Sequence, residues 1–106
     1  MKLGIIINTK DPEIAWNALR LGSAARDAGH KVKVFLLGSG VEIEDIKDEA
    51  FNAAELLKKF AKSEASLLGC GTCMRLRHRE PGVILKSSMA DLVQLISESD
   101  KVVSFG

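Results

Sequence analysis

The residues best suited to chemistry are two cysteines separated by two residues, in the segment Cys70-Gly71-Thr72-Cys73. A cysteine thiolate is a nucleophile and a metal ligand, so this spacing indicates redox, persulfide or metal chemistry in a reducing compartment. Cys70 follows a short apolar stretch that is typical of a strand, and a helical turn is predicted to begin after it. Backbone N–H groups of Gly71, Thr72 and Cys73 would then point at the Cys70 sulfur and favour its thiolate. We therefore predict that Cys70 is the more acidic and more reactive thiol.

Basic residues follow the two cysteines closely: Arg75, Arg77 and Arg79, with His78 among them. Positive charge within reach of a sulfur lowers the pKa of the thiol and holds an anionic substrate. Arg75 and Arg77 are the nearest candidates for this role. The alternative is a solvated surface in which the arginines pair with Glu80, an arrangement that contributes little to stability. His78 is interpreted as a surface histidine, because Glu80 is the one evident carboxylate beside it.

Three other interpretations of the cysteine pair remain open. Structural zinc usually needs four ligands, and this chain offers Cys70, Cys73, His78 and the distant His30, so we expect no metal. A thioredoxin-type dithiol usually opens a long helix and carries an aromatic residue or proline between its cysteines, unlike this motif. Cys73 equally fits a small buried core residue. No cofactor is expected either, because Gly38-Ser39-Gly40 is too little for a phosphate-binding loop.

The elements that position these residues can be read from apolar patterning. Strands are predicted over residues 2–8, 32–37, 66–69 and 101–105. Helices are predicted to begin at Asp11-Pro12-Glu13, at Phe51-Asn52 and at a capping box from Ser88 to Asp91, and the first is expected to end at Gly29. The expected buried faces of the three helices are Ile14, Ala18, Leu21 and Ala25; Phe51, Ala54, Leu57 and Ala61; and Met89, Leu92, Val93 and Ile96.

Alternation of strands and helices predicts an α/β fold, a three-layer sandwich in which a mainly parallel sheet is flanked by helices. The polar, acidic segment 38–48 is predicted as a loop at the carboxyl end of the second strand, the edge where such sheets place their sites. No linker or repeat interrupts the pattern, so we expect a single domain spanning residues 1–106.

Composition argues against two classes of partner. Lys and Arg number 15 against 14 Asp and Glu, and aromatic residues are 5% with no Tyr, so no nucleic acid is expected. The apolar run of residues 3–7 is too short to span a membrane and lacks the layout of a secretion signal. We therefore expect a cytoplasmic protein that does not enter a membrane.

These features together resemble the DsrE/DsrF-like family of sulfur-relay proteins, which includes the TusD-type subunits. The resemblance is carried by Cys70-Gly71-Thr72-Cys73-Met74 with Arg77, by Ser88-Met89-Ala90-Asp91-Leu92 and by the tail 99–105. It implies a small α/β sandwich, assembly into homo-oligomers such as trimers or hexamers, and a persulfide carried on Cys70. The family has a glycine where this chain has His78, and Cys73 matches a second cysteine found in only part of the family.

The leading hypothesis is a sulfur carrier or sulfurtransferase-like protein. Cys70 would attack a persulfide donor as a thiolate and pass the sulfur to an acceptor thiol on a partner protein. Cys73 would resolve the persulfide as sulfide, while the amides of Gly71 and Thr72, with Arg75 or Arg77, would stabilise the anion. The alternatives are a non-catalytic oligomeric scaffold or binding protein in which Cys70 is inert, and a dithiol redox protein.

Overall fold

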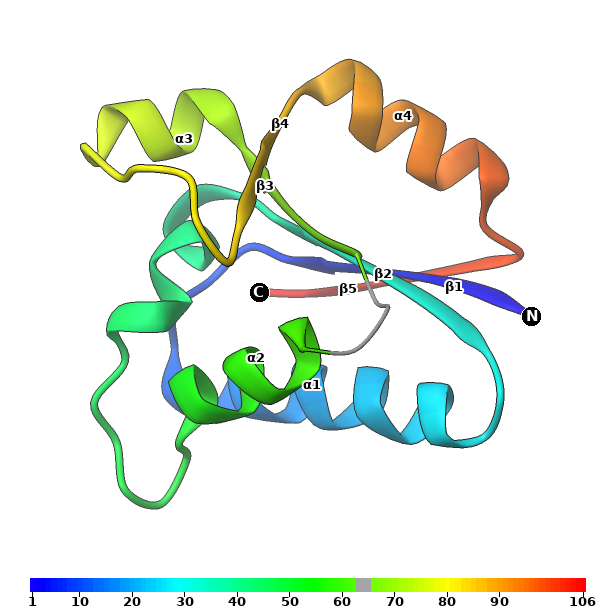
Figure 1. Cartoon of the computed structure of the whole chain (residues 1–106), viewed down its shortest axis with the longest axis horizontal. Helices are drawn as coiled ribbons and strands as arrows, with labels where there is room; N and C mark the ends of the chain where they lie inside the picture. The colour runs from blue at the N-terminus through cyan, green and yellow to red at the C-terminus, as the bar shows by residue number, and fades with distance from the viewer. Residues whose placement is uncertain (63–65) are drawn as a thin grey trace.

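Helices cover both faces of a parallel sheet in the computed structural model, which describes residues 1–62 and 66–106 (Figure 1). In chain order the elements are β1 (Lys2–Ile7), α1 (Pro12–Asp27), β2 (Lys31–Leu36), η1 (Gly38–Asp45), α2 (Ala53–Ala61), β3 (Ser66–Cys70), α3 (Gly71–Leu76), β4 (Leu85–Ser87), α4 (Met89–Glu98) and β5 (Lys101–Phe105). The five strands stand in the order β4-β3-β2-β1-β5 and every pairing is parallel. The predicted α/β architecture is confirmed. The short edge strand β4 was not predicted, because it has only three residues, two of them exposed, and its sequence carries no alternating apolar pattern.

Most of the core lies between the sheet and the pair of helices α1 and α2. Alternate residues of β1 and β2, such as Ile5 and Val34, point to this side and are fully buried. Helix α1 begins as predicted: the Asp11 side chain accepts the N–H of Ile14, and Pro12 takes the first helical position. Helix α2 begins at Asn52, whose side chain accepts the N–H of Glu55.

The predicted buried face of α1 was wrong in part. Ala18 is fully buried, but Ile14 and Leu21 are each 39% exposed. The residues that face the sheet and α2 are the smaller ones, Ala15, Ala18 and Gly22, together with Leu19. A Cβ added at Gly22 would lie 3.1 Å from the Phe60 ring, so the small residues let α1 approach α2 closely. In α2 itself Ala54 and Leu57 are buried as predicted, whereas Phe51 and Ala61 are only half-buried and Phe60 is fully buried.

Helix α4 packs on the other face of the sheet, and here too the predicted face was wrong. Leu92 is buried, as expected, and Leu95 joins it. Met89, Val93 and Ile96 are instead 57%, 66% and 45% exposed. The capping box at Ser88 is present and fixes the start of the helix directly after β4. Because α4 is the outer layer on this face, its second apolar stripe is left exposed by residues 1–62 and 66–106.

The segment after β2 is not an open loop as predicted but the short 3₁₀ helix η1. It does lie at the carboxyl edge of the sheet, as expected. Gly38 has a φ of +54°, and a Cβ added at Gly40 would collide with the carbonyl oxygen of Ile7 at the end of β1. Both glycines are therefore required for η1 to fold back over the strand ends. Within residues 1–62 and 66–106, no helix has both the length and the apolar character needed to cross a bilayer.

Candidate functional site

Cys70 lies where β3 ends and α3 begins, at the carboxyl edge of the sheet as predicted. It takes the N-cap position of α3, and its sulfur accepts a backbone N–H of the first turn, as the side-chain oxygen of a capping residue usually does. The backbone N–H of Cys73 donates to Cys70 Sγ at 3.4 Å. The strand-to-helix transition thereby brings both cysteines of the motif into one turn.

The two thiols differ in exposure. Cys70 is 4% exposed and forms a buried cluster with Phe35, Leu92 and Leu95, so the inner face of α4 covers it. Cys73 is half-buried and contacts the clusters on both sides of the sheet. Both are free thiols. A reagent in solution therefore meets Cys73 more readily than Cys70.

Burial raises the pKa of the Cys70 thiol, but other interactions outweigh it. The backbone N–H and the thiol of Cys73, the N–H of Thr72 and the positive charge of Arg77 all stabilise the Cys70 thiolate. Together they hold the pKa of Cys70 below its ordinary value. A buried cysteine with no such partners would be shifted the other way.

Cys73 is shifted in the opposite direction. Burial, the hydrogen bond that its thiol donates to Cys70 and the charge of a Cys70 thiolate all raise the pKa of Cys73. The N–H of Gly38 donates to Cys73 Sγ at 3.3 Å and, with Arg77, opposes this without reversing it. One turn therefore holds two neighbouring thiols whose pKa values are shifted in opposite directions.

Arg77 and Arg79 bind acidic residues of η1 and not Glu80. Arg77 Nε lies 3.1 Å from Glu42 Oε1, and Arg77 Nη1 donates to the Cys73 carbonyl at 3.3 Å. Arg79 lies 2.9 Å from both Glu44 and Asp45. The arginines therefore do form ion pairs at the surface, as the alternative interpretation expected. Their partners are carboxylates about 35 positions earlier in the chain.

Of the two arginines proposed for anion binding, Arg77 is the one whose charge acts on both thiols. Arg75 is exposed on the outer side of α3. Gly71 serves a packing role, because a Cβ there would lie 2.9 Å from Lys86 Cε and 3.0 Å from the Ser87 carbonyl oxygen of β4. Thr72 contributes its N–H to Cys70, and its side chain is exposed.

Sequence reasoning missed two members of the site, Gly38 and Glu42. A signal for them was present: the acidic residues of segment 38–48 and the arginines of segment 75–79 were both expected near the same sheet edge. Opposite charges so placed indicate contact between the two segments. Among the described residues, no group of three or more His, Cys, Asp and Glu side chains is arranged to hold a metal ion. His30 lies with the N-terminal amine, at 2.8 Å, and not with the cysteines.

His78 adopts a backbone conformation that favours glycine. Its φ is +53°, in the left-handed region, and its N–H donates to the Arg75 carbonyl in the turn that ends α3. A non-glycine residue pays about 1 kcal/mol or more for this conformation. This conformation explains why the resemblance leads one to expect glycine at this position. His78 adopts the same left-handed conformation in spite of its side chain.

Comparison with known proteins gives one family and two archaeal relatives. Residues 1–105 match the DsrE/DsrF-like family. An uncharacterised protein of Methanocaldococcus jannaschii is 35% identical over 115 aligned residues, covering 99% of this chain and all of that protein. An uncharacterised protein of Methanopyrus kandleri is 36% identical over 101 residues, covering 88% of this chain and 83% of that protein.

Proposed function

The chain belongs to the DsrE/DsrF-like family, and we propose that it is a sulfur carrier that holds a persulfide on Cys70 and passes the sulfur to a partner thiol. The family match supports sulfur relay at the level of the family. The observation that carries the specific proposal is the position of Cys70, an almost fully buried cysteine at the N-cap of α3 whose sulfur accepts the N–H of Cys73 at 3.4 Å, a setting that lowers its pKa. We place this activity in the reducing cytoplasm, where both thiols stay free.

The transfer needs no external oxidant or reductant. The Cys70 thiolate attacks the terminal sulfur of a donor persulfide, a new S–S bond forms, and the donor leaves as a thiolate with the electron pair of the broken bond. An acceptor thiolate then attacks the terminal sulfur held on Cys70, and Cys70 leaves as a thiolate. A low thiol pKa assists this second step because a more acidic thiol is a better leaving group.

Cys73 governs how long the persulfide lasts. As a thiolate it would attack Cys70 Sγ, release hydrosulfide and leave a disulfide between the two cysteines. The raised pKa of Cys73 keeps it protonated and slows this discharge. The neutral thiol then serves as a hydrogen-bond donor to the sulfur on Cys70.

Mass spectrometry after exposure to a small persulfide donor tests the proposal. The expected result is a gain of one sulfur atom in the wild-type protein and in Cys73→Ser, and no gain in Cys70→Ser. A loss of two hydrogens in the wild type, with no gain of sulfur in Cys73→Ser, would identify a dithiol redox protein, a candidate favoured by the hydrogen bond between the two thiols. An unchanged mass in all three proteins would identify a scaffold in which the buried Cys70 is inert.

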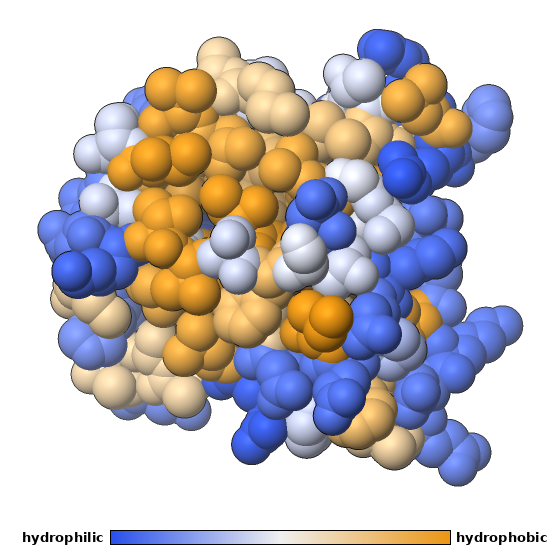
Figure 2. All heavy atoms as spheres, turned by 180° about the vertical axis from the view of Figure 1, so that it is seen from behind, coloured by the Kyte–Doolittle hydropathy of each residue, from blue (hydrophilic) through white to orange (hydrophobic). Residues whose placement is uncertain are grey.

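We further propose that copies of the chain assemble, as a trimer or hexamer, and that sulfur donor and acceptor proteins dock on the assembly. Seen from behind, hydrophobic side chains gather in one broad region of the surface (Figure 2). Met89, Val93 and Ile96 of α4 are exposed, and Val102 and Val103 are exposed on the edge strand β5. An open strand edge beside an apolar helix face favours association with a second copy.

A further inference from the structure

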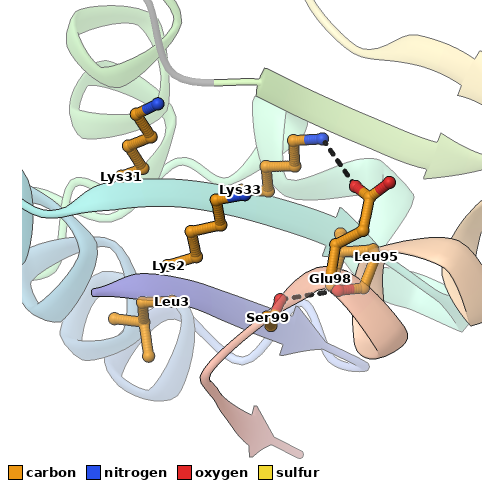
Figure 3. Close-up of a pocket in the computed structure, with 7 residues that line it drawn as sticks. All are labelled: Lys2, Leu3, Lys31, Lys33, Leu95, Glu98 and Ser99. Atoms are coloured by element: carbon orange, nitrogen blue, oxygen red, sulfur yellow. Dashed lines mark hydrogen bonds and ion pairs between the residues drawn. The ribbon is translucent and has the colours of Figure 1, made fainter.

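We propose that a pocket at the amino-terminal end of the sheet binds a small oxyanion with two or more negative charges. The pocket has a volume of about 210 Å³ and lies between the sheet and the end of α4 (Figure 3). Its lining includes Lys2, Lys31 and Lys33, with Leu95, Glu98 and Ser99 opposite. It lies at the opposite end of the strands from Cys70, so this inference does not rest on the sulfur-carrier proposal.

Strand alternation and register bring the three lysines together. Lys31 and Lys33 are two residues apart on β2 and therefore share a face. Lys2 is the register partner of Lys31 on the neighbouring strand β1. In the close-up, all three side chains rise from the same side of the sheet, and Lys2 extends across β2 toward Lys33 (Figure 3).

This arrangement leaves positive charge uncompensated. Glu98 Oε2 lies 3.8 Å from Lys33 Nζ, and it is the one carboxylate in the pocket lining. Asp100 lies close by, where its carboxylate accepts the backbone N–H of Lys2 at 2.7 Å, so three ammonium groups face two carboxylates and one positive charge is left over. Like charges on directly neighbouring strand positions destabilise a sheet. A bound multivalent anion would remove this repulsion and gain charge-assisted hydrogen bonds from the ammonium groups.

The wall opposite the lysines is fixed by close packing at Gly4. A Cβ at Gly4 would lie 2.7 Å from Leu95 Cδ2 and 2.9 Å from Ser99 Oγ, so the end of α4 presses directly on β1. The Ser99 hydroxyl donates to the Leu95 carbonyl at 2.6 Å and completes the helix end. The pocket thus has one wall fixed around Leu95 and a flexible basic wall, which suits a phosphate ester or a dicarboxylate with a small apolar part.

Titration with inorganic phosphate, monitored by the amide NMR signals of the protein, tests the inference. A titration with sodium chloride at equal ionic strength is the control. We expect saturable shifts at residues 2, 31 and 33 with phosphate and not with chloride. Lys31→Gln and Lys2→Gln should each weaken binding by about tenfold or more, because each removes a charged hydrogen-bond donor. Lys59→Gln is the matched control, since it removes the same charge from α2 on the other face of the sheet.

Shifts that do not saturate, or equal affinities in Lys31→Gln and Lys59→Gln, would show general screening and overturn the inference. Thermal unfolding at low ionic strength gives a second readout. Without phosphate, Lys31→Gln should be at least as stable as the wild type, because it relieves repulsion with Lys2. Addition of phosphate should raise the unfolding temperature of the wild type and of Lys59→Gln more than that of Lys31→Gln. A clear loss of stability in Lys31→Gln without phosphate would contradict the claim of uncompensated charge.

Discussion

The two faces of the sheet are covered very differently. On one side, α1 and α2 enclose the larger buried cluster, in which residues such as Ile5 and Leu57 have no exposed surface. On the other side, α4 covers a small cluster: Phe35, Cys70, Leu92 and Leu95. The lightly covered face also carries the lysine pocket. The comparison indicates that the closed face secures the fold, while on the other face a single helix, α4, covers Cys70.

The largest expected effect is on stability and belongs to the closed face. Leu57→Ala should lower the free energy of unfolding by about 3–5 kcal/mol, because Leu57 is fully buried in the cluster that α1 and α2 enclose against the sheet. Denaturant titration gives the value. The pH dependence of Cys70 alkylation should not change in this variant under native conditions. A shift in that dependence would show that the two faces are not independent.

The same substitution on the α4 face should cost less and expose the thiol. Leu92→Ala should destabilise by about 2 kcal/mol, at the low end for such changes, since Leu92 is 7% exposed and the site is open to relaxation. Removing its side chain also uncovers Cys70, so alkylation of Cys70 in the native protein should accelerate. If Leu92→Ala lowered the free energy of unfolding as much as Leu57→Ala does and left the alkylation rate of Cys70 unchanged, the proposed difference between the two faces would be contradicted.

A smaller effect is expected at the arginine that serves the thiols. Arg77→Gln removes positive charge near Cys70, so the pKa of Cys70 should rise and its alkylation at neutral pH should slow. Stability should change by about 1 kcal/mol or less, because the ion pair with Glu42 is partly exposed. Arg75→Gln is the control and should leave the alkylation rate unchanged. Equal slowing in both variants would indicate a general charge effect and not a specific position for Arg77.

The smallest change in the free energy of unfolding is expected on the exposed apolar side of α4, formed by Met89, Val93 and Ile96. A substitution there should instead change the assembly of the protein. Val93→Glu places a charge on a side chain that is 66% exposed, so the free energy of unfolding should change by about 0.5 kcal/mol or less. Light scattering should show a smaller assembly than the wild type. Gln94→Glu adds the same charge at the next position of the helix and should keep the wild-type mass. A wild-type protein that is already monomeric at micromolar concentration would contradict the proposed self-association.

Local signals predicted much of this molecule. The strands other than β4, the helix starts at Asp11, Asn52 and Ser88, and the place of Cys70 all follow from patterns within a few residues. Helix faces were harder, because both α1 and α4 carry more apolar positions than one buried side requires. Which stripe is buried was decided by close approaches at Gly22 and Gly4, tens of residues away from their partners.

The cysteine turn of the site was predicted, but two residues that contact it from η1, Gly38 and Glu42, were missed. The turn after Cys70 is local, so the N–H groups that stabilise its thiolate were foreseeable. Gly38 and Glu42 reach the site because β2 and β3 are neighbours in the sheet, and the sequence signal for this contact was indirect, in the opposite charges of segments 38–48 and 75–79. The lysine pocket has the same origin, since it depends on the register of β1 with β2.

The most direct test of the account is the pH dependence of alkylation in Cys70→Ser and Cys73→Ser, measured with a small reagent. The thiolate is the reactive form, so each rate rises with pH through the pKa of the remaining thiol. In Cys73→Ser the serine hydroxyl and the backbone N–H still donate to Cys70, and we expect its midpoint below the ordinary value of about 8.5. In Cys70→Ser, Cys73 should titrate at a higher pH than Cys70 does. A lower midpoint for Cys73 than for Cys70 would contradict the assignment of Cys70 as the sulfur-carrying thiol.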